Sequence, residues 1–273
     1  MKKILIATDL DRTLLPNGNH KLSKGAINSF KILIKKTNKK IILIYITGRN
    51  KTLILQAIKK YNLPKPEFCI SMVGSVIYKY EKNSLIEDKN WENHLKKSSK
   101  NFNSEKIISS LKDIKQLKLQ PKKYLNDFKV SYYLKNKSLL KSTLKKIKLE
   151  LKKNKINAKV IYSFDVNRKI GLIDVMHKNA NKLSALYFLL DKLKIKKQNI
   201  VYCGDSGNDL EIFKSGIKSI LVKNASYDFK EKLKKEIKKN KKMKIYFARG
   251  NFKNLNGNYV SGILEGINHY KFV

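Results

Sequence analysis

The chain has 273 residues, of which 42% are hydrophobic and 30% are charged. This composition supports a sizeable buried core, which excludes a disordered chain and a miniature protein held together by disulfides. No apolar run approaches the roughly 18–20 residues of a membrane span, so we expect no membrane partner. The basic start of the chain carries Asp9 and Asp11 where a signal peptide would be apolar. This predicts a cytoplasmic protein.

The formal net charge is +40, from 61 lysine and arginine residues against 21 aspartate and glutamate residues. Such a charge attracts polyanions, and a non-catalytic polyanion-binding protein is one hypothesis for the function. However, only four of the cations are arginine, the side chain that specific nucleic-acid readers favour. The lysines are scattered, and Asn, Ile, Tyr and Phe, which have AT-rich codons, are abundant. We therefore attribute the charge to genome base composition and expect no specific nucleic-acid partner.

The first 80 residues alternate between apolar runs and amphipathic stretches. Short apolar runs, of the kind buried in parallel sheets, lie at residues 4–8, 41–46 and 68–72. Between them, apolar residues at helical spacing predict helices over 23–34 and 53–61. This order predicts an α/β fold with a Rossmann-like, doubly wound parallel sheet.

From residue 81 to residue 169 the chain is polar and rich in lysine. Helices predicted at 104–117 and 138–152, with strands at 129–134 and 158–164, indicate an inserted α+β domain. Beyond it α/β alternation resumes, with strands predicted at 170–175, 200–203, 220–222 and 245–248 and helices at 182–193, 210–214, 227–239 and 259–270. We therefore predict a core of residues 1–80 and 170–273 around an insertion of residues 81–169. Cys69 and Cys203 each lie in an apolar run and are expected to be reduced core residues.

The first chemical signal is Asp9-Leu10-Asp11, directly after the first predicted strand. The carboxyl ends of strands are where open α/β sheets bind their ligands. Two adjacent carboxylates repel one another, and burying them without a proton or a cation costs several kcal/mol. A divalent cation that prefers oxygen ligands, such as Mg²⁺, resolves the conflict. A strand-end turn with helix-capping carboxylates is the alternative for this motif alone.

A second acidic motif, Gly204-Asp205-Ser206-Gly207-Asn208-Asp209, follows the predicted strand at 200–203. It places two more carboxylates at a strand end, and its glycines allow tight turning around a ligand. Alone, it could be a loop before a helix capped by Asn208 or Asp209. Together, the two motifs offer four carboxylates from two strand ends, which a purely structural interpretation explains only as two coincidences. We therefore predict a shared cation site.

Two further groups fit a phosphate ligand. Thr47, Gly48 and Arg49 end the second predicted strand and offer a hydroxyl, a flexible amide and a cation to an anion at a helix N-terminus. Lys182 opens a predicted helix after Asp174, where its ammonium could compensate a phosphate and a nucleophilic carboxylate. Because lysine is abundant, the significance of Lys182 depends on its position relative to the other motifs.

Four motifs thus occur in the order DLDRT (9–13), ITGR (46–49), Lys182 and GDSGND (204–209). In this order they resemble the four motifs of the haloacid dehalogenase (HAD) superfamily of Mg²⁺-dependent phosphohydrolases. The insertion between the second and third motifs is similar to the C2B-type cap of one branch. Further stretches resemble the sucrose-phosphate phosphatase family of that branch, at 72–78, 129–134, 161–163, 173–175 and 262–270. The resemblance spans nearly the whole chain and implies a catalytic core with a substrate-selecting cap.

The resemblance also implies a role for each motif residue. Asp9 would be the nucleophile that forms an aspartyl-phosphate, and Asp11 the acid and base that protonates the leaving sugar oxygen and then activates water. The phosphate would be held by Thr47, Gly48, Lys182 and Asn208. Mg²⁺ would bind Asp9, the main-chain carbonyl of Asp11, and Asp205, while Asp209 orients the metal shell or Lys182.

The implied reaction is hydrolysis of a sugar phosphate monoester, such as sucrose 6-phosphate, to free sugar and phosphate. Mannosylfructose phosphate and glucosylglycerol phosphate, which are other compatible-solute phosphates, are alternative substrates. Substrate contacts are expected from Arg12, Arg49, Tyr132 and Asp174. The chain departs from the family pattern at Arg12, where Gly or Asn is common, and at Leu172, where the family has an acid expected to help bind the sugar. The sequence carries no indication of the oligomeric state.

Overall fold

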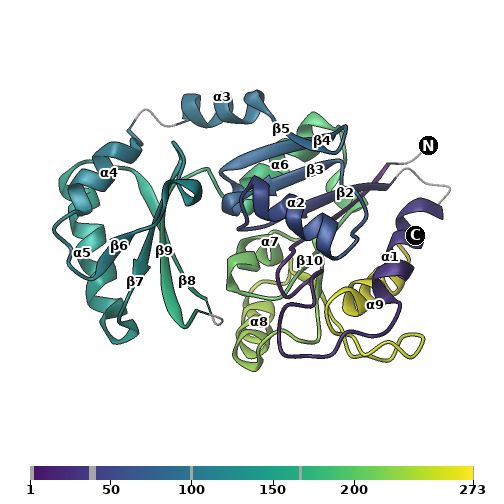
Figure 1. Cartoon of the computed structure of the whole chain (residues 1–273). Helices are drawn as coiled ribbons and strands as arrows, with labels where there is room; N and C mark the ends of the chain where they lie inside the picture. The colour runs from purple at the N-terminus through teal and green to yellow at the C-terminus, as the bar shows by residue number, and fades with distance from the viewer. Residues whose placement is uncertain (1–2, 37–40, 99–100, 166–167, 273) are drawn as a thin grey trace.

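The computed structural model describes residues 3–36, 41–98, 101–165 and 168–272. Two sheets organise the chain, and they lie in separate parts of the molecule (Figure 1). An eight-stranded sheet forms the core, and a four-stranded sheet forms a cap beside it. Within the described ranges, no helix combines the length and apolarity needed to cross a membrane.

The core sheet has the strand order β12-β11-β10-β1-β2-β3-β4-β5. Its strands are β1 (Ile4–Thr8), β2 (Ile41–Ile46), β3 (Phe68–Ser71), β4 (Val76–Glu81), β5 (Ser84–Glu87), β10 (Ile200–Gly204), β11 (Lys218–Leu221) and β12 (Lys244–Phe247). The strands from β12 to β3 are parallel, whereas β4 and β5 form an antiparallel edge. The predicted Rossmann-like parallel sheet is therefore confirmed, with β1 between β10 and β2.

Helices cover both faces of the core sheet. One face packs against α1 (Ala26–Lys36), α2 (Lys51–Lys60) and α9 (Val260–His269), and the other against α3 (Lys89–Ser98), α6 (Lys182–Lys192), α7 (Leu210–Lys214) and α8 (Tyr227–Lys239). Successive side chains of a strand point to opposite faces, so Ile4 and Ile6 join the first cluster, and Leu5 and Ala7 the second. Burial on both faces explains why β1 and β2 are almost continuous apolar runs.

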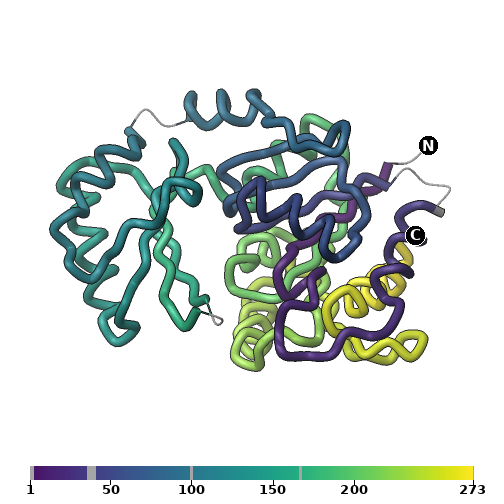
Figure 2. The backbone as a smooth tube through the Cα atoms, in the orientation of Figure 1, coloured from purple at the N-terminus to yellow at the C-terminus, as the bar shows by residue number. Residues whose placement is uncertain are grey.

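The cap sheet is antiparallel, with the order β6-β7-β9-β8. Its strands are β6 (Leu117–Leu119), β7 (Lys129–Leu134), β8 (Ala158–Asp165) and β9 (Ile170–His177). Helices α4 (Ser104–Leu111) and α5 (Leu140–Lys153) cover one face and share an apolar cluster with it. The other face is turned toward the core, as the ribbon and the backbone tube both show (Figures 1 and 2). The predicted α+β cap is therefore present.

Strand pairing corrects the predicted domain boundaries at residues 81 and 170. Strand β5 lies beyond residue 81 but pairs with β4 in the core sheet. Strand β9, which begins at Ile170 and was expected to resume the core, pairs with β7 and β8 in the cap. An apolar run does not reveal which sheet edge supplies its hydrogen-bond partners, and here both neighbours of β9 are cap strands. The cap therefore extends to His177.

The predicted helices and strands differ from the observed ones mainly around the cap. The helix predicted at 104–117 ends at Leu111, and Leu117 begins β6 instead. Helix α3 was not predicted, and it carries the buried Trp91, whose indole donates to the Gly74 carbonyl at 3.1 Å. Cys69 and Cys203 are free and buried, as expected for reduced core residues.

Candidate active site

The carboxyl ends of three neighbouring parallel strands bring the sequence motifs together. Asp9 follows β1, Asp205 follows β10 on one side, and Thr47 follows β2 on the other. The pairing of β1 with β10 continues to this end of the strands, since the Asp9 amide donates to the Cys203 carbonyl at 2.9 Å. Motifs far apart in the sequence therefore share one edge of the sheet, where α/β folds bind their ligands.

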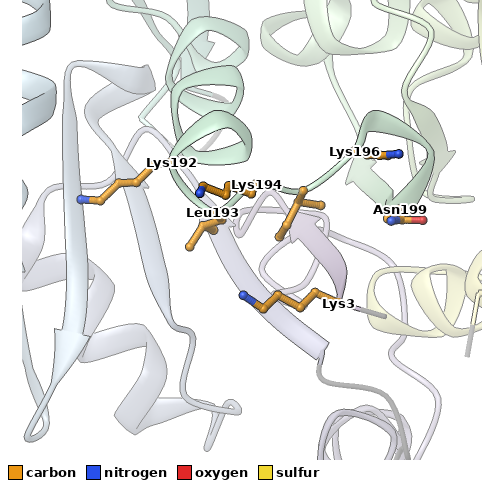
Figure 3. A pocket seen from close by; sticks show the side chains of 7 residues that line it. Lys3, Lys192, Leu193, Lys194, Lys196 and Asn199 are labelled. Atoms are coloured by element: carbon orange, nitrogen blue, oxygen red, sulfur yellow. The ribbon is translucent and has the colours of Figure 1, made fainter. Parts of the chain in front are cut away.

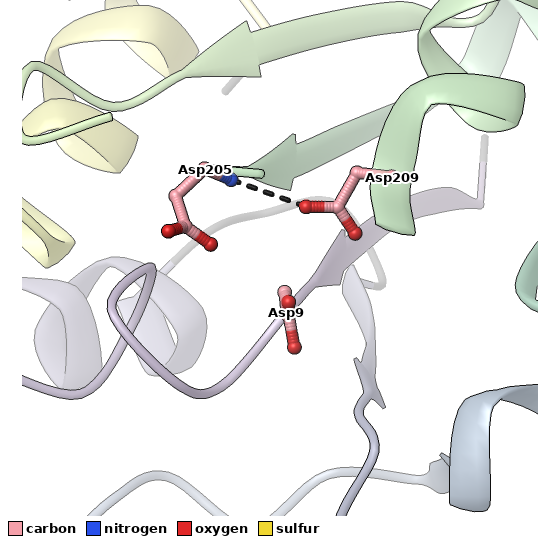
Figure 4. A group of neighbouring side chains, drawn as sticks. All are labelled: Asp9, Asp205 and Asp209. Atoms are coloured by element: carbon pink, nitrogen blue, oxygen red, sulfur yellow. Dashed lines mark hydrogen bonds between the residues drawn. The ribbon is translucent and has the colours of Figure 1, made fainter. Parts of the chain in front are cut away.

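Asp9, Asp205 and Asp209 form a buried acidic cluster (Figure 4). One carboxylate oxygen of each residue lies within 4.8 Å of the others. Burial, with the nearby Asp209, raises the pKa of Asp205 to about 6. Burial also raises the pKa of Asp9 well above its ordinary value, although Lys182 opposes that shift. Such a cluster is stable only with protons or cations that compensate its charge.

Lys182 places a positive charge inside this cluster. Its ammonium donates to Oδ2 of Asp9 at 3.0 Å and to Oδ1 of Asp209 at 2.7 Å, and lies 3.4 Å from Oδ1 of Asn208. The side chain is only 2% exposed. Burial lowers the pKa of Lys182, but the carboxylates of Asp209 and Asp9 outweigh it, so the pKa is raised and the ammonium stays charged.

Two glycines allow this arrangement. Gly74 has a φ of 105°, and a Cβ there would lie 2.2 Å from the carbonyl carbon of Asn181 and 2.6 Å from the amide nitrogen of Lys182. Any side chain at residue 74 would displace the start of α6, which carries Lys182. A Cβ at Gly204 would lie 2.6 Å from Oδ2 of Asp209. Both positions therefore require glycine because the backbone approaches a residue of the site.

The Asp209 carboxylate accepts four hydrogen bonds within the protein. Its Oδ1 accepts from Lys182 and from the Tyr202 hydroxyl at 2.5 Å, and its Oδ2 accepts from the amides of Asp205 and Ser206 at 3.2 Å each. All of its lone-pair positions are thus in use. This arrangement favours the role of holding Lys182 over direct binding of a cation. Tyr202 was not predicted, and its only sequence signal is a tyrosine in an aliphatic strand before the acidic motif.

The Asp11 carboxylate is held by Arg49 and Asn17 rather than by the acidic cluster. Arg49 donates to Oδ2 from Nε at 2.8 Å and to Oδ1 from Nη2 at 2.6 Å, and the Asn17 amide donates to Oδ1 at 2.5 Å. A third guanidinium nitrogen, Nη1, donates to the Leu53 carbonyl at 3.1 Å. Three of the five guanidinium N–H groups of Arg49 are thus engaged by Asp11 and the backbone, and contact between Arg49 and the substrate stays a prediction. Asn17 lies in a loop without a motif, so sequence reasoning missed it.

The other predicted phosphate ligands flank Asp9. Thr47 is fully buried, and its hydroxyl accepts from the Arg49 amide at 3.1 Å. Gly48 is exposed beside it. On the opposite side, the Asn208 side chain accepts from the Ser206 hydroxyl at 3.0 Å. The loops after β2 and β10 thus bring small polar groups to both sides of the strand that ends at Asp9.

The cap presents polar side chains to the core from β7 and β9. Lys129 lies 3.0 Å from Oδ1 of Asp174, and the Ser131 hydroxyl donates to the same oxygen at 2.5 Å. Tyr132 points to the opposite face and is buried in the apolar cluster with α4 and α5. The prediction that Tyr132 contacts the substrate is therefore wrong. Adjacent strand residues face opposite ways, and the register of KVSYYL was not known from its sequence.

The donor set fits a hard divalent cation such as Mg²⁺. The carboxylates of Asp9, Asp205 and Asp209, with the ammonium of Lys182, leave two negative charges uncompensated. Oxygen donors from one or two carboxylates, completed by water and phosphate oxygens, are what Mg²⁺ commonly takes. Asp9 and Asp205 keep acceptor capacity for this purpose, whereas Asp209 does not.

We expect the metal-free protein to become less stable as the pH rises from about 4 to above 6. The folded-state pKa of Asp205, about 6, exceeds its ordinary value of 3.8, so the folded state binds the proton more tightly than the unfolded state. The stability from this proton is present below the unfolded pKa and is lost as the pH rises through the folded pKa, by up to ~3 kcal/mol. Thermal unfolding in EDTA at pH 5 and pH 8 measures this difference.

Mg²⁺ should restore the lost stability at pH 8, because it replaces the missing proton. The matched control is Asp205→Asn, which should flatten the pH dependence and weaken the response to Mg²⁺. A melting temperature in EDTA that does not fall between pH 5 and pH 8 would contradict the expected ionisation of the cluster.

A depression rich in lysine lies at the amino ends of the core strands, away from the acidic motifs (Figure 3). It is lined by Lys3, Lys192, Leu193, Lys194, Ile195, Lys196 and Asn199. These residues precede β1 and β10, whereas the acidic motifs follow them. The basic surface is therefore separate from the candidate active site.

The sheet order, the cap and the acidic strand ends, together with the relatives described below, place the chain among the HAD-type phosphohydrolases. The fold is similar to that of the sucrose-phosphatase from Synechocystis sp. PCC6803, whose structure was solved in complex with sucrose and phosphate. The TM-score is 0.78 at 24% sequence identity, with 100% of both chains covered. The profile of the sucrose-6F-phosphate phosphohydrolase family matches residues 2–271. The chain belongs to this family, which confirms the resemblance inferred from its motifs.

Individual relatives agree with this placement. A protein of Nitrosococcus oceani named as a HAD-like hydrolase is 37% identical over 269 residues, covering 98% of this chain and 72% of that protein. Sucrose-phosphatase 2 of Nicotiana tabacum is 27% identical over 228 residues, covering 82% of this chain and 51% of that protein. The chain thus spans about half the length of this plant relative.

Proposed function

We propose that the chain hydrolyses a sugar phosphate monoester through an aspartyl-phosphate in a Mg²⁺-dependent reaction, with sucrose 6-phosphate as the first candidate substrate. The observation that carries the proposal is the buried Lys182 ammonium between the carboxylates of Asp9 and Asp209. A lysine in this position favours the ionised form of the Asp9 nucleophile and places a cation where the phosphate dianion would bind. Membership of the sucrose-6F-phosphate phosphohydrolase family supports the class of substrate.

Asp9 is oriented for attack by hydrogen bonds to both carboxylate oxygens. Its Oδ1 accepts from the Leu10 amide at 2.7 Å, and its Oδ2 accepts from Lys182 at 3.0 Å. An Asp9 oxygen forms a bond to phosphorus while the bond from phosphorus to the sugar oxygen breaks. Water then attacks the phosphorus, the bond to Asp9 breaks, and inorganic phosphate leaves. Thr47, Gly48, Lys182 and Asn208 would hold the phosphate oxygens through both steps.

Asp11 would move the protons. It donates one to the sugar oxygen in the first step and takes one from water in the second, so it ends as it began. Arg49 and Asn17 hold Asp11 as a carboxylate through both of its oxygens, so one oxygen has to be released and take up a proton from solvent before the first transfer. Asp9, Asp205 and the main-chain carbonyl of Asp11 would hold Mg²⁺, which when bound supplies positive charge that reduces repulsion between carboxylate and phosphate.

Contacts between cap and core support a cap that closes over this site. The Asn50 side chain, next to Arg49, donates to the Lys123 carbonyl of the cap at 3.1 Å. The Asn126 side chain donates to the Ser75 hydroxyl at 2.8 Å, and Lys159 of β8 pairs with Glu211 of α7. Closure of this kind excludes water from the reacting groups.

The sugar would lie against the core-facing side of the cap sheet. Asp174 and Leu172 share this side because they are two residues apart on β9. Asp174 offers an acceptor to sugar hydroxyls, whereas Leu172 offers only apolar contact. A substrate panel is therefore required to rank sucrose 6-phosphate against mannosylfructose phosphate, glucosylglycerol phosphate and a monosaccharide 6-phosphate.

Phosphate release from this panel tests the proposal. We expect release only with Mg²⁺, loss in EDTA, and a disaccharide phosphate with the highest kcat/KM. A magnesium-free reaction at the same ionic strength is the control for the effect of salt on this highly charged protein. Absence of phosphate release from every substrate, together with duplex DNA binding that persists at physiological salt, would favour the polyanion-binding hypothesis instead.

A further inference from the structure

Arg12 adds a second cation beside the acidic cluster, and its backbone is tightly held. Its φ is 59°, in the left-handed region that favours Gly and Asn. The Arg12 amide donates to the Asn17 side chain at 2.7 Å, and its carbonyl accepts from the Asn224 side chain at 2.6 Å. These two bonds hold the backbone in an unfavourable conformation, so the direction of the Arg12 Cα–Cβ bond is set by the fold.

The Arg12 side chain faces Asp205. Its Nε lies 3.6 Å from Oδ2 of Asp205, while the Thr13 hydroxyl donates to Oδ1 at 3.2 Å. A Cβ at Gly18 would lie 3.7 Å from Cγ and Nε of Arg12, so the side chain passes close to the Gly18 backbone. The Arg12 side chain is 39% exposed, whereas the Asp205 side chain is only 3% exposed. Arg12 thus lies on the solvent side of a buried carboxylate that is positioned to bind a metal ion.

The charges of the site show what Arg12 changes. Asp11 and Arg49 neutralise each other, and the buried cluster with Lys182 carries two uncompensated negative charges. The positive charge of Arg12 leaves one of these two negative charges uncompensated. A divalent cation would therefore leave the site with one positive charge, whereas without Arg12 the site would be neutral. A phosphate dianion binds better to the positively charged site.

We propose that Arg12 weakens binding of the divalent cation at Asp205 and strengthens binding of the phosphate dianion to the metal-loaded site. The inference rests on the proposed function, since it assigns the cation and the phosphate to this cluster. A unit charge about 6 Å from a divalent ion changes its binding constant by about tenfold even at the dielectric constant of water. A positive charge at a similar distance from a phosphate dianion raises the binding constant of the dianion by about the same factor.

Isothermal titration of the full chain with MgCl₂ tests the first half of this inference. The experiment is run at pH 8 and constant ionic strength on wild type, Arg12→Gln and Arg12→Lys. We expect Arg12→Gln to bind Mg²⁺ about tenfold more tightly than wild type, and Arg12→Lys, which keeps the charge, to stay within about threefold of it. Titration of the Mg²⁺-loaded proteins with inorganic phosphate tests the second half, and Arg12→Gln should bind phosphate about tenfold more weakly.

The outcomes separate this inference from the proposed function. If wild type binds Mg²⁺ and Arg12→Gln binds it equally well or more weakly, the role of Arg12 is refuted while the metal site stands. If wild type binds no Mg²⁺, the metal-dependent function itself is refuted. Melting temperatures of both variants within about 2 °C of wild type establish that the affinities are compared between equally folded proteins.

Discussion

An Asp9→Asn variant is expected to lose at least about a thousand-fold in kcat while remaining folded. The amide nitrogen of asparagine is not a nucleophile, but its oxygen can still accept the hydrogen bond that Oδ1 of Asp9 takes from Leu10 at 2.7 Å. The substitution also removes one of three crowded, buried carboxylates. The relief of this crowding offsets the lost hydrogen bond from Lys182 to Oδ2, so the melting temperature in EDTA at pH 8 should stay close to that of wild type, while phosphate release disappears.

Asp88→Asn is the matched control for this loss. The Asp88 side chain is only 6% exposed, pairs with Lys192 and accepts a hydrogen bond from the Asn90 amide of α3 at 3.1 Å, which asparagine can also accept. We expect wild-type kcat from this variant. Activity of Asp9→Asn above about one tenth of wild type would exclude Asp9 as the nucleophile and require another group to attack the phosphorus.

A Lys182→Met variant is expected to lose both activity and stability. Removal of the ammonium leaves the carboxylates of Asp9 and Asp209 buried without the partner that lies 3.0 Å and 2.7 Å from them. Breaking a buried ion pair on one side costs about 3–5 kcal/mol. The loss in free energy of unfolding should be smaller at pH 5 than at pH 8, because protonated carboxylates do not need the ammonium. Denaturant unfolding in EDTA at both values measures it.

Two comparisons make this prediction specific. Lys192→Met changes the same residue type at the other end of α6, where the lysine side chain is 38% exposed, and should cost less than about 1 kcal/mol with full activity. The double variant Lys182→Met/Asp209→Asn removes both partners and should recover part of the stability but none of the activity. A single Lys182→Met variant as stable as wild type at pH 8 in EDTA would contradict the charge distribution described for the cluster.

Strands β1 and β2 could be predicted residue for residue, because each is buried on both faces and is therefore a continuous apolar run. The places of Asp9 and Thr47 directly after these strands could be predicted for the same local reason. Helix α8 was also predicted, as a very basic helix, at its observed bounds, Tyr227–Lys239. These features depend on residues close together in the chain.

Sheet membership could not be predicted in the same way. Strand β9 has the apolar pattern of a core strand, yet it joins the cap because β7 and β8 offer it hydrogen-bonding edges. Strand β5 is too short and polar to be recognised, although it extends the core sheet. Whether Tyr132 faces the core or the helices of the cap depended on a register that pairing alone sets.

By itself, the sequence determined the fold class and the two acidic motifs that follow adjacent strands. Only the tertiary structure decided the partners of those acids: Arg49 and Asn17 for Asp11, Tyr202 and Lys182 for Asp209, and Arg12 for Asp205. The physical reason is that the two kinds of feature depend on residues at different separations along the chain. Strand and helix patterns arise from neighbours in the chain, whereas charge compensation in a buried site depends on distances between side chains that only the folded backbone brings together.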